Sequence, residues 1–128
     1  MAVNTTGANN TAVGALSLDA NTTGAANTSV GKGALTTNTT GDSNVAVGKG
    51  ALEASTTASN NTAVGASSLE ANTSGDNNVA VGKSSLLANT TGDKNTAMGI
   101  EALKTNTVGD RSVAVSYTHL TLPTKRIV

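Results

Sequence analysis

Residues 44–60 read Asn-Val-Ala-Val-Gly-Lys-Gly-Ala-Leu-Glu-Ala-Ser-Thr-Thr-Ala-Ser-Asn, and residues 78–94 read Asn-Val-Ala-Val-Gly-Lys-Ser-Ser-Leu-Leu-Ala-Asn-Thr-Thr-Gly-Asp-Lys. The two stretches share their apolar, glycine and threonine positions, and they start two 17-residue periods apart (78 − 44 = 34). Six full copies of this unit run from residue 10 to residue 111, with partial copies on both sides. A unit this short cannot bury its apolar face alone, so successive copies must stack on one another.

Three columns of equivalent residues predict the core and the turns. The apolar residues that precede the repeat glycine are Val13, Val30, Val47, Val64, Val81 and Met98. The second apolar column is Leu18, Leu35, Leu52, Leu69, Leu86 and Leu103, and the glycine column is Gly14, Gly31, Gly48, Gly65, Gly82 and Gly99. We predict that the valine and leucine columns form two ladders inside the fold. The glycines should end a strand at a backbone angle or a close approach that a side chain would forbid.

The segment before each glycine has the pattern of a β-strand. Val45-Ala46-Val47 alternates with a period of two, which places the valines on one face and the alanine on the other. Asn-Thr-Thr-Gly-Asp is turn chemistry, whereas residues 49–54 fit either a single helical turn or a second short strand. The sequence therefore predicts an all-β parallel solenoid or β-roll of 17-residue coils, about 30 Å long at the interstrand spacing of ~4.8 Å.

Composition narrows the class of protein further. The chain has 128 residues, no net charge, 12% charged residues and 1% aromatic residues. The scarcity of aromatic residues excludes an ordinary aromatic-rich core. A chain without net charge also lacks the excess of basic residues with which proteins attract nucleic acid. We expect no membrane insertion by this segment, because no apolar run approaches the ~20 residues that span a bilayer. Since each coil offers few large apolar side chains against the entropy of ordering it, we expect association with identical chains.

No catalytic constellation is present in the repeats, so we expect neither an enzyme nor a cofactor. The recurring carboxylates Asp42, Asp76, Asp93 and Asp110 could in principle hold calcium, but the dense glycine-aspartate grouping of calcium-binding β-helix repeats is missing. We interpret these aspartates as turn residues, Glu53 and Glu70 as surface charges, and expect no metal site. Gly31-Lys32-Gly33 lacks the spacing of a phosphate-binding loop. We interpret this lysine and its counterparts as surface charges that oppose edge-to-edge pairing of sheets.

One threonine column offers a candidate binding surface. It consists of Thr22, Thr39, Thr56, Thr73, Thr90 and Thr107. If these residues face outward, they form a regular row of methyl and hydroxyl groups, which resembles the surface of ice-binding solenoids. The alternative is an internal hydrogen-bonded turn ladder. A flat binding face also needs a second parallel row, and the adjacent threonines are poor candidates because neighbouring residues in a strand face opposite sides.

The ends of the sequence suggest its boundaries. Residues 1–115 form the repeat array, which begins within a repeat, so we expect it to be a piece of a longer array. At residue 116 the register fails, and residues 116–128 contain the single Tyr, His and Pro of the chain. This tail resembles a translated sequencing-library adapter, and we interpret it as non-native.

The motif Asn44-Val45-Ala46-Val47-Gly48 and its counterpart in residues 78–82 resemble the core motif of trimeric autotransporter adhesin heads of the YadA type. The longer unit is also similar to repeats of phage tail fibres. The resemblance implies a left-handed parallel β-roll, three interwound chains, and an extracellular place on a bacterial surface or a virion tail. It implies a structural and adhesive function toward a host surface or a glycan. The alternative function is a monomeric threonine-ladder solenoid that binds ice.

Overall fold

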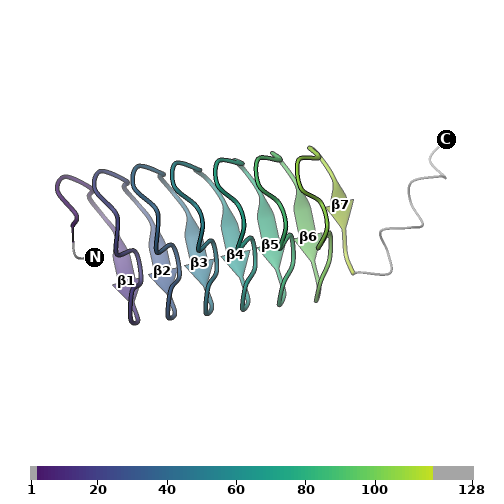
Figure 1. The fold of residues 1–128 in the computed structure, drawn as a ribbon, viewed down its shortest axis with the longest axis horizontal. Helices are drawn as coiled ribbons and strands as arrows, with labels where there is room; N and C mark the ends of the chain where they lie inside the picture. Colours follow the sequence, from purple (N-terminus) through teal and green to yellow (C-terminus); the bar gives the residue numbers. More distant parts are fainter. Residues whose placement is uncertain (1–2, 117–128) are drawn as a thin grey trace.

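The computed structural model describes residues 3–116 and shows a β-solenoid, as predicted. Consecutive coils stack along one axis, and each contributes one short strand (Figure 1). All seven strands lie in one parallel sheet in chain order. They are β1 (Thr11–Val13), β2 (Thr28–Val30), β3 (Val45–Val47), β4 (Thr62–Val64), β5 (Val79–Val81), β6 (Thr96–Met98) and β7 (Val113–Ala114).

Every coil pairs with the next at equivalent positions of the repeat. Between β3 and β4, Val45 pairs with Thr62 and Val47 with Val64. Hydrogen bonds between coils continue outside the strands: the Leu52 N–H donates to the Ser68 carbonyl at 3.0 Å, for example. Hydrogen bonds between coils therefore form around much of each coil, and side chains at equivalent positions of the repeat lie directly above one another.

The core is narrow and consists mainly of leucine and alanine. The six leucines of the predicted ladder are buried, with between 0% and 3% of their surface exposed. Opposite them lie the central strand residues, such as Ala46, Ala63 and Ala80, which are completely buried. The leucine part of the predicted core is confirmed.

The valine part of that prediction is wrong for this chain. The valine column and the central strand residues do occupy opposite faces of the sheet, but the central residue, which is alanine or Ser29, is the one that points inward. Val13 is 56% exposed and Met98 49%, while Val47 and Val64 are about one-third exposed. The remaining members, Val30 and Val81, are half-buried. The physical reason is that the leucines fill the interior, so that only a methyl group or a hydroxymethyl group fits behind the sheet.

The segment that the sequence left open is neither a helix nor a strand. Within residues 3–116 there is no helix, and this segment is a series of turns. The leucines of the core have φ between 48° and 52°, in the left-handed region that interrupts an α-helix. Burial of these side chains between neighbouring coils holds the backbone there.

The glycine column behaves as predicted, and both suggested causes apply. The φ angles of these six residues lie between 117° and 139°. A Cβ added to Gly48 would lie 2.6 Å from the carbonyl carbon of Gly65 in the next coil. Glycine is therefore required by the backbone angle and by the close approach of the adjacent coil.

Candidate functional surfaces

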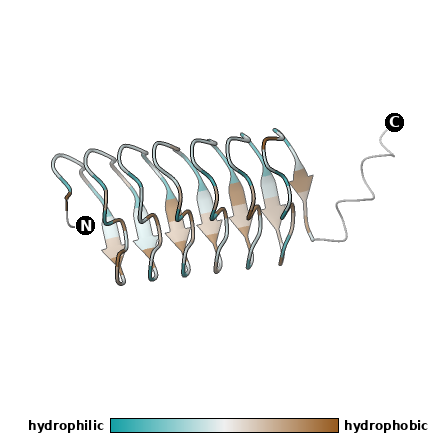
Figure 2. Cartoon of the chain, viewed as in Figure 1, coloured by the Kyte–Doolittle hydropathy of each residue, from teal (hydrophilic) through white to brown (hydrophobic). Residues whose placement is uncertain are grey.

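The outer face of the sheet is an exposed apolar strip. Alternate strand residues point outward, so the valine column lies beside the column that begins with Thr11 and Thr28 and continues with Val45. Hydrophobic residues recur on strand after strand along the sheet (Figure 2). A continuous row of half-buried or exposed apolar side chains along one sheet is uncommon for a surface that meets only water. This strip is the first candidate functional surface.

The threonine column forms a hydrogen-bonded ladder between coils. Its hydroxyls donate to the backbone carbonyl of the equivalent threonine in the next coil: Thr39 Oγ1 to Thr56 at 3.1 Å and Thr73 Oγ1 to Thr90 at 3.1 Å. The side chains are nevertheless half-buried or exposed. The sequence left open an outward-facing row and an internal hydrogen-bonded ladder. The column has features of both, since its hydroxyls bond to the next coil and its side chains still border solvent.

A second row, which the sequence did not identify, shares the face of the threonines. It lies two residues earlier in each coil, and the residue between the two rows is buried: Ala71 and Thr73 face outward, whereas Asn72 is 0% exposed. Backbone bonds from Ala71 to Leu87 and from Thr73 to Thr90 run in parallel there. This row consists of Ala20, Thr37, Ala54, Ala71, Ala88 and Thr105. The two rows form the second candidate surface.

The aspartate column caps backbone groups of the preceding coil. Asp76 Oδ1 accepts the Ser59 N–H at 2.7 Å, and Asp93 Oδ1 accepts the Asp76 N–H at the same distance. Ser59 takes the same role with its hydroxyl toward Asp42. Within residues 3–116 no three metal-ligating side chains cluster together. The aspartates therefore join the turns of neighbouring coils by hydrogen bonds. A turn residue that contacted only solvent would not make these bonds.

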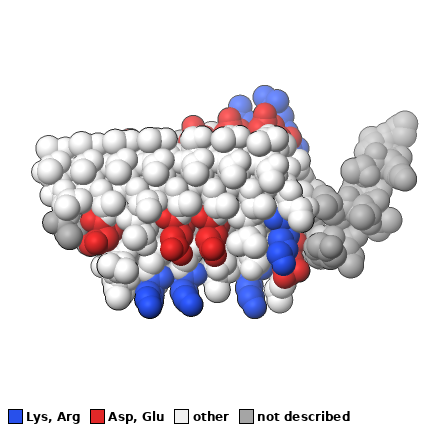
Figure 3. Space-filling view, viewed as in Figure 1, with Lys and Arg blue, Asp and Glu red and all other residues white. Residues whose placement is uncertain are grey.

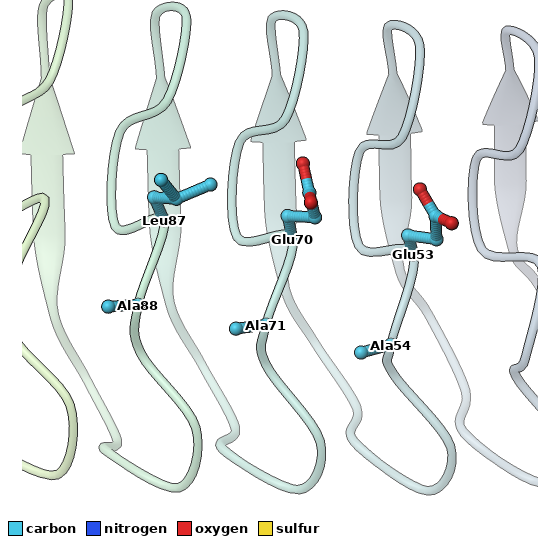
Figure 4. A pocket seen from close by; sticks show the side chains of 6 residues that line it. All are labelled: Glu53, Ala54, Glu70, Ala71, Leu87 and Ala88. Atoms are coloured by element: carbon cyan, nitrogen blue, oxygen red, sulfur yellow. The ribbon is translucent and has the colours of Figure 1, made fainter.

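Glu53 and Glu70 border a shallow, open groove of about 460 Å³. Its other lining residues are Leu87 and the alanines Ala54, Ala71 and Ala88. Figure 4 shows these residues on three consecutive coils, with the two carboxylates at equivalent positions. The carboxylates face an apolar floor with no converging donors among the residues lining it. The arrangement provides neither an acid–base pair nor a closed binding cavity.

Two ladders of buried asparagines hold the coils together, and one of them escaped the sequence analysis. Asn44 Oδ1 accepts the Asn61 N–H at 3.0 Å, while its Nδ2 donates to the Ala58 carbonyl at 2.8 Å. The other ladder, the turn ladder, is formed by the asparagines that begin the Asn-Thr-Thr-Gly-Asp turns, and it links Asn89 Nδ2 to Asn72 Oδ1 at 2.9 Å. The available signal was the recurrence of asparagine directly before each of the strands β1 to β6, because its amide can both donate to a backbone carbonyl and accept from a backbone N–H.

Charged side chains are few. Figure 3 shows lysines projecting along the lower margin, acidic groups on the face directly above them, and acidic and basic groups mixed at the upper margin toward the C-terminal coils. The lysines that follow the strands are Lys32, Lys49 and Lys83, all exposed. Much of the remaining surface in this view is uncharged.

Other sequence predictions lie outside these surfaces or outside the described residues. Tyr117, His119 and Pro123 belong to the part of the tail beyond residue 116. In the described part of the chain, no helix combines the length and hydrophobicity required to cross a bilayer. Comparison with protein-family models, with curated proteins and with solved structures finds no match to this chain.

Proposed function

We propose that this chain is a structural and adhesive repeat segment of a bacterial surface adhesin or a phage tail fibre. The observation that carries the proposal is the continuity of bonding along the axis: each coil is joined to the next by backbone bonds and by asparagine, threonine and aspartate side chains. Such a stack can be extended by adding coils, because each coil contacts only its neighbours. A rod of this kind projects and displays a surface without catalysing a reaction.

The proposed assembly is a homotrimer, and its proposed location is extracellular. The support for self-association is the exposed valine strip, whose burial against copies of the chain would remove apolar surface from water. Adhesion to a host surface or a glycan would then come from many weak, identical contacts repeated along three chains. Neither a cofactor nor a metal takes part in this proposal.

An adhesion assay with multivalent display tests the proposal. Fluorescent beads coated with the full chain would be applied to epithelial and bacterial cells under flow. The matched control is a chain of the same composition with shuffled residues 10–111. We expect the repeat-coated beads to be retained, and retention to fall steeply as coating density is lowered. Equal retention of repeat-coated and shuffled beads on every surface would contradict an adhesive function.

Ice binding remains the second candidate function, and the two rows of alanine and threonine favour it. They supply the second parallel row that the sequence could not identify, and neither row contains a charged side chain. Freezing-point depression of the folded chain, measured against the variant Thr73→Lys, tests this function. Activity lost in that variant would support ice binding, whereas the absence of any activity in the folded parent chain would exclude it.

A further inference from the structure

We propose that the solenoid contains a built-in opening point, at the joint between the coil of β3 (residues 44–60) and the coil of β4 (residues 61–77). In this joint the turn at residues 53–58 lies against the turn at residues 70–75 and is hydrogen-bonded to it. The turn opens there before the equivalent turns of the neighbouring coils. The rod thus has a defined place at which it yields first, whatever surface it displays.

The turn ladder of asparagines is interrupted at this joint. Asn89 donates to Asn72 Oδ1 at 2.9 Å one joint further along, whereas the β3 coil carries Ser55 at the equivalent position. Ser55 Oγ is buried and has no hydrogen-bond partner in the described chain. Asn72 Nδ2 donates to the Gly75 carbonyl of its own coil at 2.9 Å. The joint therefore lacks the side-chain amide bond that links Asn72 to Asn89.

The threonine bonds distinguish this joint from the one before it, which also lacks the amide bond. There, the Thr39 and Thr40 N–H groups both donate to the Thr56 carbonyl, at 2.9 and 3.3 Å. In the proposed opening point a single turn N–H, that of Thr56, donates to the Thr73 carbonyl, at 3.2 Å. The Thr56 hydroxyl reaches the same carbonyl at 3.3 Å, whereas the equivalent hydroxyl bonds of the array are 2.8–3.1 Å long. This joint thus has the fewest and longest turn bonds of the two.

Two like charges lie on either side of the same joint. Glu53 and Glu70 occupy equivalent positions of the two coils (Figure 4). A Cβ added to Gly50 would lie 2.9 Å from Glu53 Oε2 and 3.8 Å from Glu70 Oε2. Among residues 3–116, neither carboxylate accepts a hydrogen bond or joins an ion pair. Like charges at directly opposed positions weaken the pairing of neighbouring segments.

This pair of like charges is specific to the joint. The column to which the two glutamates belong is Asp19, Thr36, Glu53, Glu70, Leu87 and Lys104. Each of its other neighbouring pairs contains an uncharged residue. The missing amide, the weak threonine bonds and the repulsion between carboxylates therefore coincide at one place in the array.

The other bonds of the joint confine the opening to the turn. The Val45 N–H donates to the Asn61 carbonyl at 2.8 Å, and the Leu52 N–H donates to the Ser68 carbonyl at 3.0 Å. The equivalent bonds at the next joint have the same lengths, from Thr62 at 2.8 Å and from Leu69 at 3.0 Å. The sheet and the leucine core thus hold while the turn opens, which is a local opening rather than global unfolding.

Amide hydrogen exchange of the full chain, measured by NMR, tests the inference. The N–H groups of Thr39, Thr56 and Thr73 occupy equivalent positions, and each rate is divided by its intrinsic rate. We expect Thr56 to exchange at least about tenfold faster than the other two, the factor that one lost buried hydrogen bond gives. The Val45 and Thr62 N–H groups of the strands should be equally protected. Equal protection of Thr56 and Thr73 would overturn the inference, and so would protection that only declines from the middle of the array toward its ends.

Variants test the assigned causes. Ser55→Asn with Ala58→Gly restores the turn ladder and should lower the Thr56 exchange rate to that of Thr73. The matched reverse exchange, Asn72→Ser with Gly75→Ala, should raise the Thr73 rate.

Glu70→Gln removes the repulsion and should slow exchange of the Thr56 N–H at low salt, whereas Glu101→Gln, two coils away, should leave it unchanged. Unchanged Thr56 exchange in both the restored chain and Glu70→Gln would overturn the inference. The comparison within the parent chain decides the result if a variant does not fold.

Discussion

One coil departs from the repeat at two linked positions, and restoring both should stabilise the fold. Ser55 replaces the asparagine of the turn ladder, and Ala58 replaces the glycine three residues later. Within the described residues, Asn38 Oδ1 and Ser55 Oγ are buried and have no hydrogen-bond partner. In other coils the same glycine leaves room for asparagine: a Cβ added at Gly92 would lie 2.5 Å from Asn89 Oδ1. The two departures therefore depend on each other.

The expected energies follow from these contacts. In Ser55→Asn with Ala58→Gly, the new amide can donate to Asn38 Oδ1, as Asn89 does to Asn72 at 2.9 Å. Satisfying a buried acceptor stabilises by about 1–3 kcal/mol. Replacing alanine with glycine costs about 0.4–1 kcal/mol through the unfolded chain. The double variant should gain roughly 1–2 kcal/mol by these two terms. Ser55→Asn alone should lose about 1–3 kcal/mol, because its side chain would overlap the Ala58 methyl.

Urea unfolding of the four chains of this double-mutant cycle, followed by circular dichroism at one protein concentration, measures these effects. The account predicts a favourable coupling of at least about 2 kcal/mol between the two positions, at the upper end of values for residues in contact. Additive effects, or a double variant less stable than the parent, would refute the link between asparagine and glycine. The reverse exchange, Asn72→Ser with Gly75→Ala, is the matched control and should be better tolerated than Gly75→Ala alone.

Three further predictions concern the glycines, the core and the aspartate column. Gly65→Ala should unfold the array or lower its stability by more than about 2 kcal/mol, since a methyl group there would lie 2.6 Å from the next coil's backbone. Gly33→Ala, with φ of 72° and its nearest neighbour at an ordinary contact distance of 3.5 Å, should cost only about 1 kcal/mol by thermal unfolding. Leu52→Ala should lose about 2–5 kcal/mol in urea unfolding, whereas Val47→Ala should change monomer stability by less than about 0.5 kcal/mol and instead weaken association. Asp76→Ala should cost about 1 kcal/mol, and faster hydrogen exchange of the N–H that it accepts would locate the loss; unchanged exchange would contradict the capping role.

Much of the fold could be predicted because the same pattern of residues recurs in every coil. The strand alternation, the turn residues and the glycine column each indicated a stacked coil, and the stack buries the leucines as expected. Whether the valines point into the core or toward solvent could not be predicted from alternation alone. Alternation places Val45 and Val47 opposite Ala46, but it does not say which side is inside. The width of the interior decides this, and it depends on the leucines of the opposite wall.

The buried polar ladders were harder to predict than the strands. Asparagine and aspartate in Asn-Thr-Thr-Gly-Asp are ordinary turn residues, so their burial or bonding to another coil has no local signature. Asn27 and Asn44 bond to partners 14 or 17 residues away, which only the stacked structure brings together. The left-handed φ of Leu52 is a similar case, because packing rather than propensity holds it.

The solution molar mass of the full chain, measured by light scattering after size exclusion at several concentrations, tests the central claim most directly. The proposed homotrimer predicts folded particles of three chains, in which the valine strip that is exposed in a single chain would be covered. The mass should fall toward that of one chain on dilution, since six coils provide only a small interface. A folded chain that remains monomeric at every concentration would contradict the assembly, and with it the proposed adhesin or tail-fibre function.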